Sequence, residues 1–235
     1  MEPVIYLIPN TLGSDDIREV IPAGIFGKIR TIRHFVVESE RSARRFLVRA
    51  ALDTPIDQLI FHVVDEHSRP SDIEHLISLI REQGKIGILS DAGLPGIADP
   101  GSDLVKLAHR QGIKVVPLTG PSSIFLALMA SGLNGQNFAF NGYLPIKKPE
   151  RIRKLKLLEA RSKSERQSQV FMETPYRNMS LVEDLLNHLQ PETLLCIASD
   201  ISLASESIRT QSIRQWNESV PDINKKPAIF ILQAE

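Results

Sequence analysis

The chain of 235 residues has little of several features that would identify a function directly. It holds a single cysteine, Cys196, inside an apolar run, so no disulfide can form within the chain, and we expect a buried structural thiol. Lysine and arginine together number 28, and aspartate and glutamate also number 28. This balance excludes a strong overall field toward nucleic acid or membrane, so any such attraction must come from a local patch.

Long apolar runs and targeting signals are also absent. No stretch approaches the roughly 18 uninterrupted apolar residues of a membrane-spanning helix. The first residues lack the charged start and the apolar centre of a signal peptide. We therefore expect a cytoplasmic protein without a membrane partner, and its length is sufficient for two domains of ordinary size.

The motifs of several enzyme classes are missing. The first apolar run is followed by PNTLG rather than G-x-G-x-x-G, which weakens a nicotinamide-binding interpretation, and no G-x-x-x-x-G-K-[ST] loop supports an NTPase. The six histidines and the cysteine show no metal-ligand spacing, so no metal is expected, and no G-x-S-x-G elbow indicates a hydrolase. A ligand site made of loops remains, which suits a reaction in which a cofactor brings the reactivity.

The most informative stretch is 85–101, KIGILSDAGLPGIADPG. It begins with apolar, partly β-branched residues, and these are followed directly by a segment rich in Asp, Gly and Pro. This change is typical of a buried parallel strand that ends in a binding loop. Ligands of open α/β sheets lie outside the carboxyl ends of the strands, so Asp91, Gly93 and Asp99 are expected near a small molecule. The glycines allow close backbone approach, and the prolines stiffen the loop.

The first half of the chain alternates between strands and helices. Short apolar runs predict strands at residues 4–8, 34–38, 59–64, 86–89 and 113–118. Periodicity and cap residues predict a first helix that begins near Ile17, is capped by Asp15 or Asp16, and ends at Pro22–Gly24. Further helices are predicted over 39–52, over 71–84 with Ser71 as N-cap, and over 102–112. This alternation is typical of a parallel sheet flanked by helices.

The second half has fewer helices for each strand. It predicts strands near 138–145, 169–175, 194–199, 205–213 and 227–235, with helices over 123–133, capped by Ser122 or Ser123, and 177–189. We therefore predict an α/β protein with a mostly parallel N-terminal domain, 1–118, and a C-terminal domain with a mixed sheet, 119–235. Ligand sites favour such domain interfaces.

Four stretches carry a resemblance to a known family: SDAGLPGIADPG (90–101), PLTGPSSIFLALMASGL (117–133), FNGYLP (140–145) and VFMETPYRN (170–178). The chain resembles the tetrapyrrole methylase family of S-adenosylmethionine-dependent methyltransferases. Within that family it is most similar to the branch that methylates a cytidine ribose 2′-hydroxyl of 16S ribosomal RNA. The resemblance implies two α/β domains with the cofactor in the cleft between them, and a homodimer.

The resemblance also implies which residues contact S-adenosylmethionine. The family's contacts fall on Leu12, Asp91, Gly93, Leu94, Ser122, Ser123 and Met172. Asp91 can accept hydrogen bonds from a hydroxyl or ammonium group of the cofactor. Taken alone, Asp91 also fits a turn residue, the two serines fit helix caps, and Met172 fits a core residue.

Residues for the methyl acceptor are predicted at three places. Glu38 follows a strand and is the candidate for the base that takes the acceptor's proton, with Arg41 nearby as a substrate contact. Glu173 and Arg177 lie beside a strand-to-helix turn, where they fit either an RNA contact or a surface ion pair. Residues 147–166 hold nine Lys or Arg and three acidic residues, which fits either a patch that follows phosphates or a solvated helix face.

Three functions remain open from the sequence. The preferred one is methyl transfer to a ribose 2′-hydroxyl of ribosomal RNA, free or in the small ribosomal subunit. The second keeps the fold and changes the acceptor to a tetrapyrrole or another small molecule. Two departures from the RNA branch favour it, because 38–41 reads ESER in place of Glu-Asp-Thr-Arg, and 201–203 reads ISL in place of a Thr-Lys pair. The third is a non-catalytic RNA-binding module.

Overall fold

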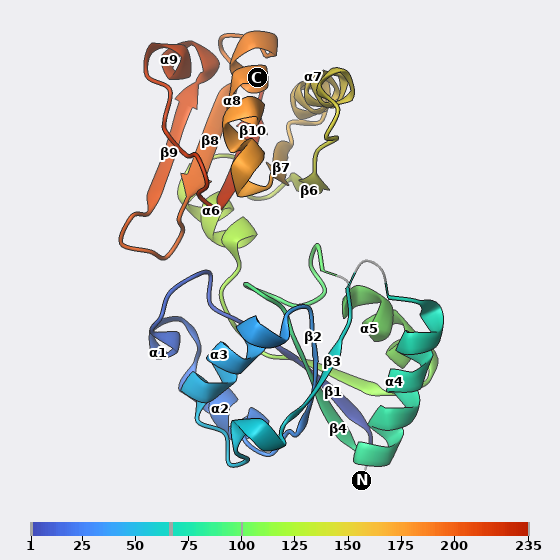
Figure 1. The fold of residues 1–235 in the computed structure, drawn as a ribbon. Helices are drawn as coiled ribbons and strands as arrows, with labels where there is room; N and C mark the ends of the chain where they lie inside the picture. The colour runs from blue at the N-terminus through green and yellow to red at the C-terminus, as the bar shows by residue number, and fades with distance from the viewer. Residues whose placement is uncertain (1, 66–67, 100, 235) are drawn as a thin grey trace. The chain divides into compact units, whose positions relative to one another are not determined.

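A computed structural model describes residues 2–65, 68–99 and 101–234. The chain divides into two compact units, Met1–Ser122 and Ser123–Glu235, each with its own sheet and helices (Figure 1). This division falls after Ser122, whereas the sequence places the domain boundary after Leu118. None of the described helices is both long enough and apolar enough to cross a membrane.

The first unit is built on a parallel five-stranded sheet with the order β3-β2-β4-β1-β5. Its strands are β1 (Val4–Ile8), β2 (His34–Val37), β3 (Ile60–Val63), β4 (Lys85–Leu89) and β5 (Lys114–Pro117). Several of these strands read as nearly continuous apolar runs because helices cover both faces of a parallel sheet.

The helices of this unit lie on both faces of its sheet (Figure 1). They are α1 (Ile17–Val20), α2 (Ala23–Ile29), α3 (Glu40–Ala50), α4 (Pro70–Gln83) and α5 (Gly101–Arg110), with a 3₁₀ turn η1 (Ile56–Gln58). Ile8 and Phe35 pack in the core under α1, α2 and α3, whereas Ile5 and Val36 pack in the core under α4 and α5. Burial on both faces holds the strand ends in fixed positions.

Two local features of the first unit differ from the sequence prediction. Helix α2 was not predicted, because Pro22 and two glycines obscure its pattern; burial of Ile25 and Ile29 stabilises it despite weak helix propensity. The prediction of Ser71 as N-cap is wrong. Helix α4 begins at Pro70, one residue before Ser71, and its N-cap is Arg69. Proline suits a first helical position, and the Arg69 N–H donates to the Asp72 side chain at 3.1 Å.

Other predicted helix ends are confirmed. Asp16 is the N-cap of α1 and accepts a hydrogen bond from the Arg18 N–H at 2.9 Å. Gly84 follows α4 in the left-handed conformation, with φ of 78°, which glycine adopts without steric cost.

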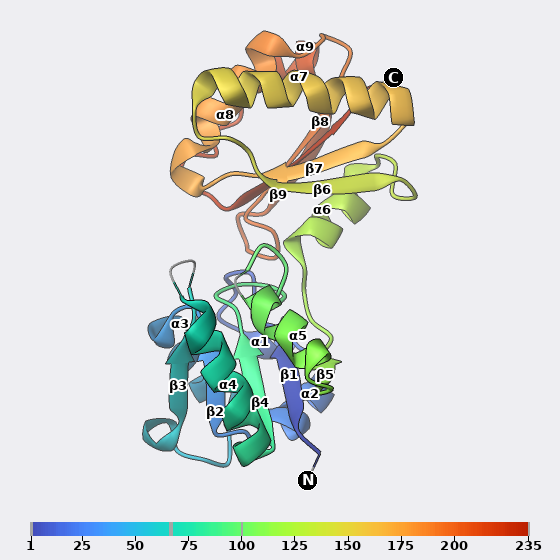
Figure 2. The same ribbon diagram turned by 90° about the vertical axis from the view of Figure 1, so that its right-hand side faces the viewer.

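The second unit contains a mixed five-stranded sheet, as predicted, with the order β6-β7-β10-β8-β9 (Figure 2). Its strands are β6 (Phe138–Tyr143), β7 (Ser168–Met172), β8 (Leu194–Ser199), β9 (Ser207–Ser212) and β10 (Ala228–Gln233). Strands β6 and β7 are parallel, and the other pairs are antiparallel. The predicted fold class, α/β with one parallel and one mixed sheet, is therefore confirmed.

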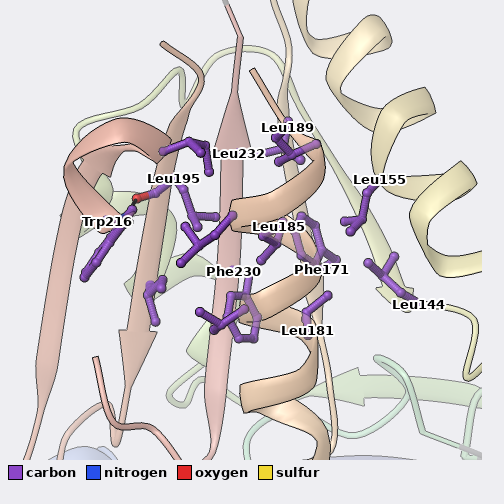
Figure 3. Close-up of a cluster of buried hydrophobic side chains, with 14 of the residues drawn as sticks. Leu144, Leu155, Phe171, Leu181, Leu185, Leu189, Leu195, Trp216, Phe230 and Leu232 are labelled. Atoms are coloured by element: carbon purple, nitrogen blue, oxygen red, sulfur yellow. Dashed lines mark hydrogen bonds between the residues drawn. The ribbon is translucent and has the colours of Figure 1, made fainter. Parts of the chain in front are cut away.

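Four helices pack against the second sheet (Figure 2). They are α6 (Ser123–Ser131) on one face, and α7 (Lys148–Glu165), α8 (Asn178–His188) and α9 (Ile213–Glu218) on the other, with a 3₁₀ turn η2 (Pro175–Arg177) before α8. Figure 3 shows the core beneath α7, α8 and α9, where Phe171 and Phe230 stack with ring centres 5.8 Å apart. The Trp216 indole N–H donates to the Leu195 carbonyl at 2.8 Å. Cys196 is buried as predicted, and this burial raises the pKa of its thiol.

Candidate functional site

The carboxyl ends of β1 and β4 form the place where a parallel sheet of this order binds ligands. The connection after β1 leads to β2 on one side of this pair, and the connection after β4 leads to β5 on the other side. Ligands of open α/β sheets bind where neighbouring connections diverge in this way. The loops after these two strands, 9–13 and 90–99, are therefore the candidate ligand loops.

Asn10 joins the two loops. Its side-chain amide donates to the carbonyls of Ser90 and Asp91, both at 3.1 Å, and its backbone N–H donates to the Gly93 carbonyl at 2.8 Å. A Cβ added to Gly93, which has φ of 68°, would lie 3.3 Å from the Leu12 side chain. The structure thus brings the predicted contacts Leu12, Asp91 and Gly93 together, and Asn10, which the sequence prediction missed, fixes their loops.

The loop after β5 also approaches the loop after β1. A Cβ added to Gly120 would lie 2.1 Å from Cβ of Pro9, so only glycine allows these loops to come so close. Ser122, two residues further along, is partly exposed.

Carboxylates gather at the same edge of the sheet. Glu38 follows β2 and accepts a hydrogen bond from the Asp91 N–H at 3.3 Å. Burial, followed by the nearby Asp99 carboxylate, raises the pKa of Glu38 to about 7. Asp91 is an exposed residue, yet partial burial of its carboxyl group raises its pKa. Hydrogen bonds from the Ser42 hydroxyl and the Ser39 N–H have the opposite effect and lower this pKa, but they are outweighed. These groups place several hydrogen-bond acceptors in one small region.

One buried carboxylate oxygen in this region makes no hydrogen bond to the described residues. The Asp99 carboxylate accepts the Gly101 N–H at 2.6 Å through Oδ1, whereas its buried Oδ2 has no hydrogen bond within the described residues. S-adenosylmethionine carries an ammonium group, a sulfonium and two ribose hydroxyls. Because carboxylates accept hydrogen bonds and favour positive charge, the residues present fit that cofactor.

The remaining predicted residues of the first unit lie near this edge. Leu94 is partly buried in the loop after β4. Arg41 is exposed in the first turn of α3 and makes no ion pair within the described residues. Within those residues, no group of three or more His, Cys, Asp or Glu could hold a metal ion.

The second unit contains a different polar cluster at the carboxyl end of β7. Glu173 is only 4% exposed, and its Oε1 accepts hydrogen bonds from the Thr174 N–H at 2.7 Å and from Arg177 Nε at 2.9 Å. Its buried Oε2 has no partner within the described residues. Glu173 and Arg177 are therefore brought together as an ion pair, although Glu173 is buried rather than on the surface. Met172 precedes them at the end of β7 and is partly exposed, and Ser123 is the first residue of α6.

Comparison with known proteins identifies a family and sequence relatives. The family described as Tetrapyrrole (Corrin/Porphyrin) Methylases matches residues 30–216. The chain is 31% identical over 232 residues to a Vibrio cholerae protein named ribosomal RNA small subunit methyltransferase I, covering 98% of this chain and 76% of that protein. The Pasteurella multocida protein of the same name is 28% identical over 236 residues, with coverage of 99% and 79%.

Solved structures of similar fold exist. The methyltransferase CobJ aligns with a TM-score of 0.64 at 16% identity, covering 99% of this chain and 94% of its own. Uroporphyrin-III-C-methyltransferase from Thermus thermophilus aligns with a TM-score of 0.59 at 19% identity, also covering 99% and 94%. At these identities the likeness shows the fold alone.

Proposed function

We propose that this chain, which belongs to the tetrapyrrole (corrin/porphyrin) methylase family, transfers a methyl group from S-adenosylmethionine to ribosomal RNA of the small subunit. The observation that carries the proposal is the acceptor-rich edge of the first unit, where Asn10 holds two ligand loops together beside three carboxyl groups. The names of the relatives at 28–31% identity support the RNA substrate.

The predicted cofactor contacts divide between the two units. Leu12, Asp91, Gly93, Leu94 and Ser122 belong to the first unit, and Ser123 and Met172 to the second. In our proposal Asp91 accepts hydrogen bonds from the cofactor's donors, and the buried Asp99 Oδ2 is a further acceptor for them. The glycine-containing loops let backbone groups approach the ligand, and the rigid frame that Asn10 provides reduces the entropy lost on binding.

The cofactor, when bound, supplies a methyl group on an already reactive sulfonium, so the chain's main task is alignment. We propose a ribose 2′-hydroxyl as acceptor, and such a hydroxyl must lose its proton during transfer. Glu38, whose pKa is raised to about 7, is the proposed base, because a group with that pKa is partly ionised at neutral pH and can still hold a proton. Arg41, exposed in the first turn of α3, is the proposed substrate contact beside it.

Two further properties belong to this proposal. A ribosomal RNA substrate implies that the protein works in the cytoplasm. The resemblance to the family implies that it works as a homodimer.

Transfer of labelled methyl groups tests the proposed function. The full chain is incubated with labelled S-adenosylmethionine and, separately, with small-subunit ribosomal RNA, assembled small subunits and tetrapyrroles. We expect label in the RNA or the subunits, removed by ribonuclease. Label only in a tetrapyrrole contradicts the RNA acceptor, and cofactor binding without transfer to any of these acceptors supports a non-catalytic RNA-binding module instead.

A further inference from the structure

We infer that one surface of the second unit binds single-stranded RNA, an inference that rests on the proposed function. We name it the tyrosine–α7 surface, and it consists of Tyr143, Tyr176, Arg177, Arg153, Lys154 and Lys156. Sequence-specific proteins mostly bind RNA in single-stranded loops, where bases stack on aromatic side chains and the backbone follows positive charge.

The topology of the unit brings these residues to one end of its sheet. Strands β6 and β7 are parallel neighbours, and Tyr143 pairs with Met172 at their carboxyl ends. Tyr176 lies in η2, just after β7, and α7 begins just after β6. The Arg151 guanidinium, in the first turn of α7, donates to the Ser180 hydroxyl, in the first turn of α8, at 2.9 Å, so the starts of both helices lie beside each other near these strand ends (Figure 2).

Both tyrosines are available for stacking. Tyr143 is 54% exposed and Tyr176 is 79% exposed, and neither hydroxyl makes a hydrogen bond within the described residues. The register of β6 against β7 shifts between Phe140 and Tyr143, with Gly142 at φ of 64°. Irregularities of this kind re-aim a side chain at the end of a strand. Exposed aromatic faces of this size are stacking platforms that accept any base.

The Glu173–Arg177 pair adds a rigid guanidinium to the same end. Arg177 donates to Glu173 through both Nε and Nη2, and its side chain remains 32% exposed. Glu173 is buried, so it acts as a positioning residue that holds Arg177 in one orientation. A fixed guanidinium plane can stack on a base and donate its remaining N–H groups to a phosphate.

Helix α7 supplies the positive charge. Its buried face carries Leu155 and Leu158, and Arg153 and Lys156 lie on the opposite, exposed face. These two residues and the partly exposed Lys154 make no ion pair within the described residues. The segment 147–166 holds nine basic residues against three acidic ones, so a polyanion is the partner whose charge matches this helix.

Neutralising the charges of α7 tests the electrostatic part of the inference. The variant R153Q/K154Q/K156Q loses three phosphate contacts to a single strand. The slope of log affinity against log salt concentration should therefore become shallower by about 2, which corresponds to an affinity about a hundredfold lower at about 0.1 M salt. The measurement is fluorescence anisotropy of the full-length chain with labelled oligouridine across a salt series.

The chain offers a matched control for this variant. K106Q/R110Q/K114Q removes one arginine and two lysines that are also exposed, from α5 and β5 of the first unit. We expect the control to keep the wild-type slope. Equal slopes in both triple variants and the wild type overturn the inference, as does wild-type binding to anionic phospholipid vesicles in preference to oligouridine.

A second pair of variants tests stacking. Tyr176→Ala should weaken binding by about five- to a hundredfold at every salt concentration without changing the slope, because stacking carries no net charge. Tyr176→Phe keeps the ring and should retain wild-type affinity. Met129→Ala removes another large exposed side chain, at 77% exposure, and should have no effect. If Tyr176→Ala binds RNA with wild-type affinity, Tyr176 is not part of the RNA-binding surface.

Methyl transfer measured in parallel separates this inference from the proposed function. If the wild type labels small-subunit ribosomal RNA while R153Q/K154Q/K156Q binds RNA normally, the surface is wrong and the function stands. If the wild type labels no RNA, the function is wrong, whatever the binding series gives.

Discussion

The carboxylates at the strand ends of the first unit differ from the buried carboxylates of the second. Glu38 and Asp91 in the first unit make no ion pair within the described residues, and burial raises the pKa of both. In the second unit, Glu173 pairs with Arg177, and Asp184 pairs with Arg151 at 2.6 Å. Both of these carboxylates are fully buried, and each has its positive partner supplied by the chain itself.

This difference indicates where a positively charged ligand belongs. Carboxylates that make no ion pair and have raised pKa values are stabilised when a cation or hydrogen-bond donor arrives. Carboxylates already paired with arginine gain little from such a ligand, and their pairing is part of the folded structure. The first unit is therefore suited to a cofactor with ammonium and sulfonium groups, and the second offers its arginine and lysine side chains to a polyanion.

The largest expected effect comes from breaking the ion pair of the second unit. Arg151→Met leaves Asp184 buried without its main partner, which should reduce the free energy of unfolding by about 3 kcal/mol. Urea unfolding followed by the fluorescence of Trp216, the only tryptophan in the chain and a buried residue of this unit, measures the loss.

The matched control is Arg30→Met. It removes one partner of a surface pair, Arg30 and Asp53, whose side chains are 55% and 47% exposed, and should change stability by about 0.5 kcal/mol or less. We also expect R151M/D184L to recover much of the lost stability, because it leaves no buried charge. A loss in R151M no larger than that in R30M contradicts the structural role of the buried pair.

A smaller effect is expected when a carboxylate of the first unit is removed. Asp91→Ala should weaken binding of S-adenosylmethionine by at least about tenfold, or 1.4 kcal/mol, because a polar anchor for the cofactor is lost. Isothermal titration calorimetry of the full chain measures the affinity. Asp57→Ala, an exposed residue of η1, is the control and should bind as the wild type does. Unchanged affinity in a folded Asp91→Ala protein removes Asp91 from the site.

The smallest expected effect is a pH dependence in the first unit. The pKa of Glu38 is about 7 in the folded chain and 4.5 for an ordinary glutamate, so between these values the folded chain binds more protons than the unfolded chain. Stability from this group is therefore present at low pH and is lost as pH rises toward 7. Glu38→Gln mimics the neutral form, and near pH 8 it should be more stable than wild type by about 1 kcal/mol, a value reduced for solvent screening.

Calorimetric unfolding at a series of pH values measures this difference. Glu38→Gln and the wild type should be equally stable near pH 4, where both side chains are neutral. Glu19→Gln, an exposed residue of α1, is the control and should show no such divergence. A constant difference between Glu38→Gln and wild type across the range contradicts the raised pKa.

Much of the architecture follows from local sequence patterns. The apolar run at 4–8 matches β1 in full, and the apolar run at 86–89 lies within β4, because a strand buried on both faces needs apolar residues at nearly every position. The resemblance based on 90–101 and 117–133 is confirmed by the family match over residues 30–216. The sequence missed α2, whose stability comes from the burial of Ile25 and Ile29 and not from its own composition.

The candidate site was predicted less completely than the fold. Asp91 and Gly93 were found because an abrupt change from apolar residues to Asp and Gly marks a strand end. Asn10 was missed because its importance lies in hydrogen bonds to residues 80 and 81 positions away, which no local pattern records. The burial of Glu173 was missed for a similar reason, since 173–177 alone fits a surface pair equally well.

By itself, the sequence determined which segments become strands, several of the helices, the parallel and mixed character of the two sheets, and the family. Those properties depend on side-chain periodicity and on short motifs, which act over a few neighbouring residues. The tertiary structure alone decided which carboxylates make an ion pair and which do not. A pKa depends on burial and on charges within a few ångströms, and only the folded chain brings residues such as Glu38 and Asp91, 53 positions apart, to that distance.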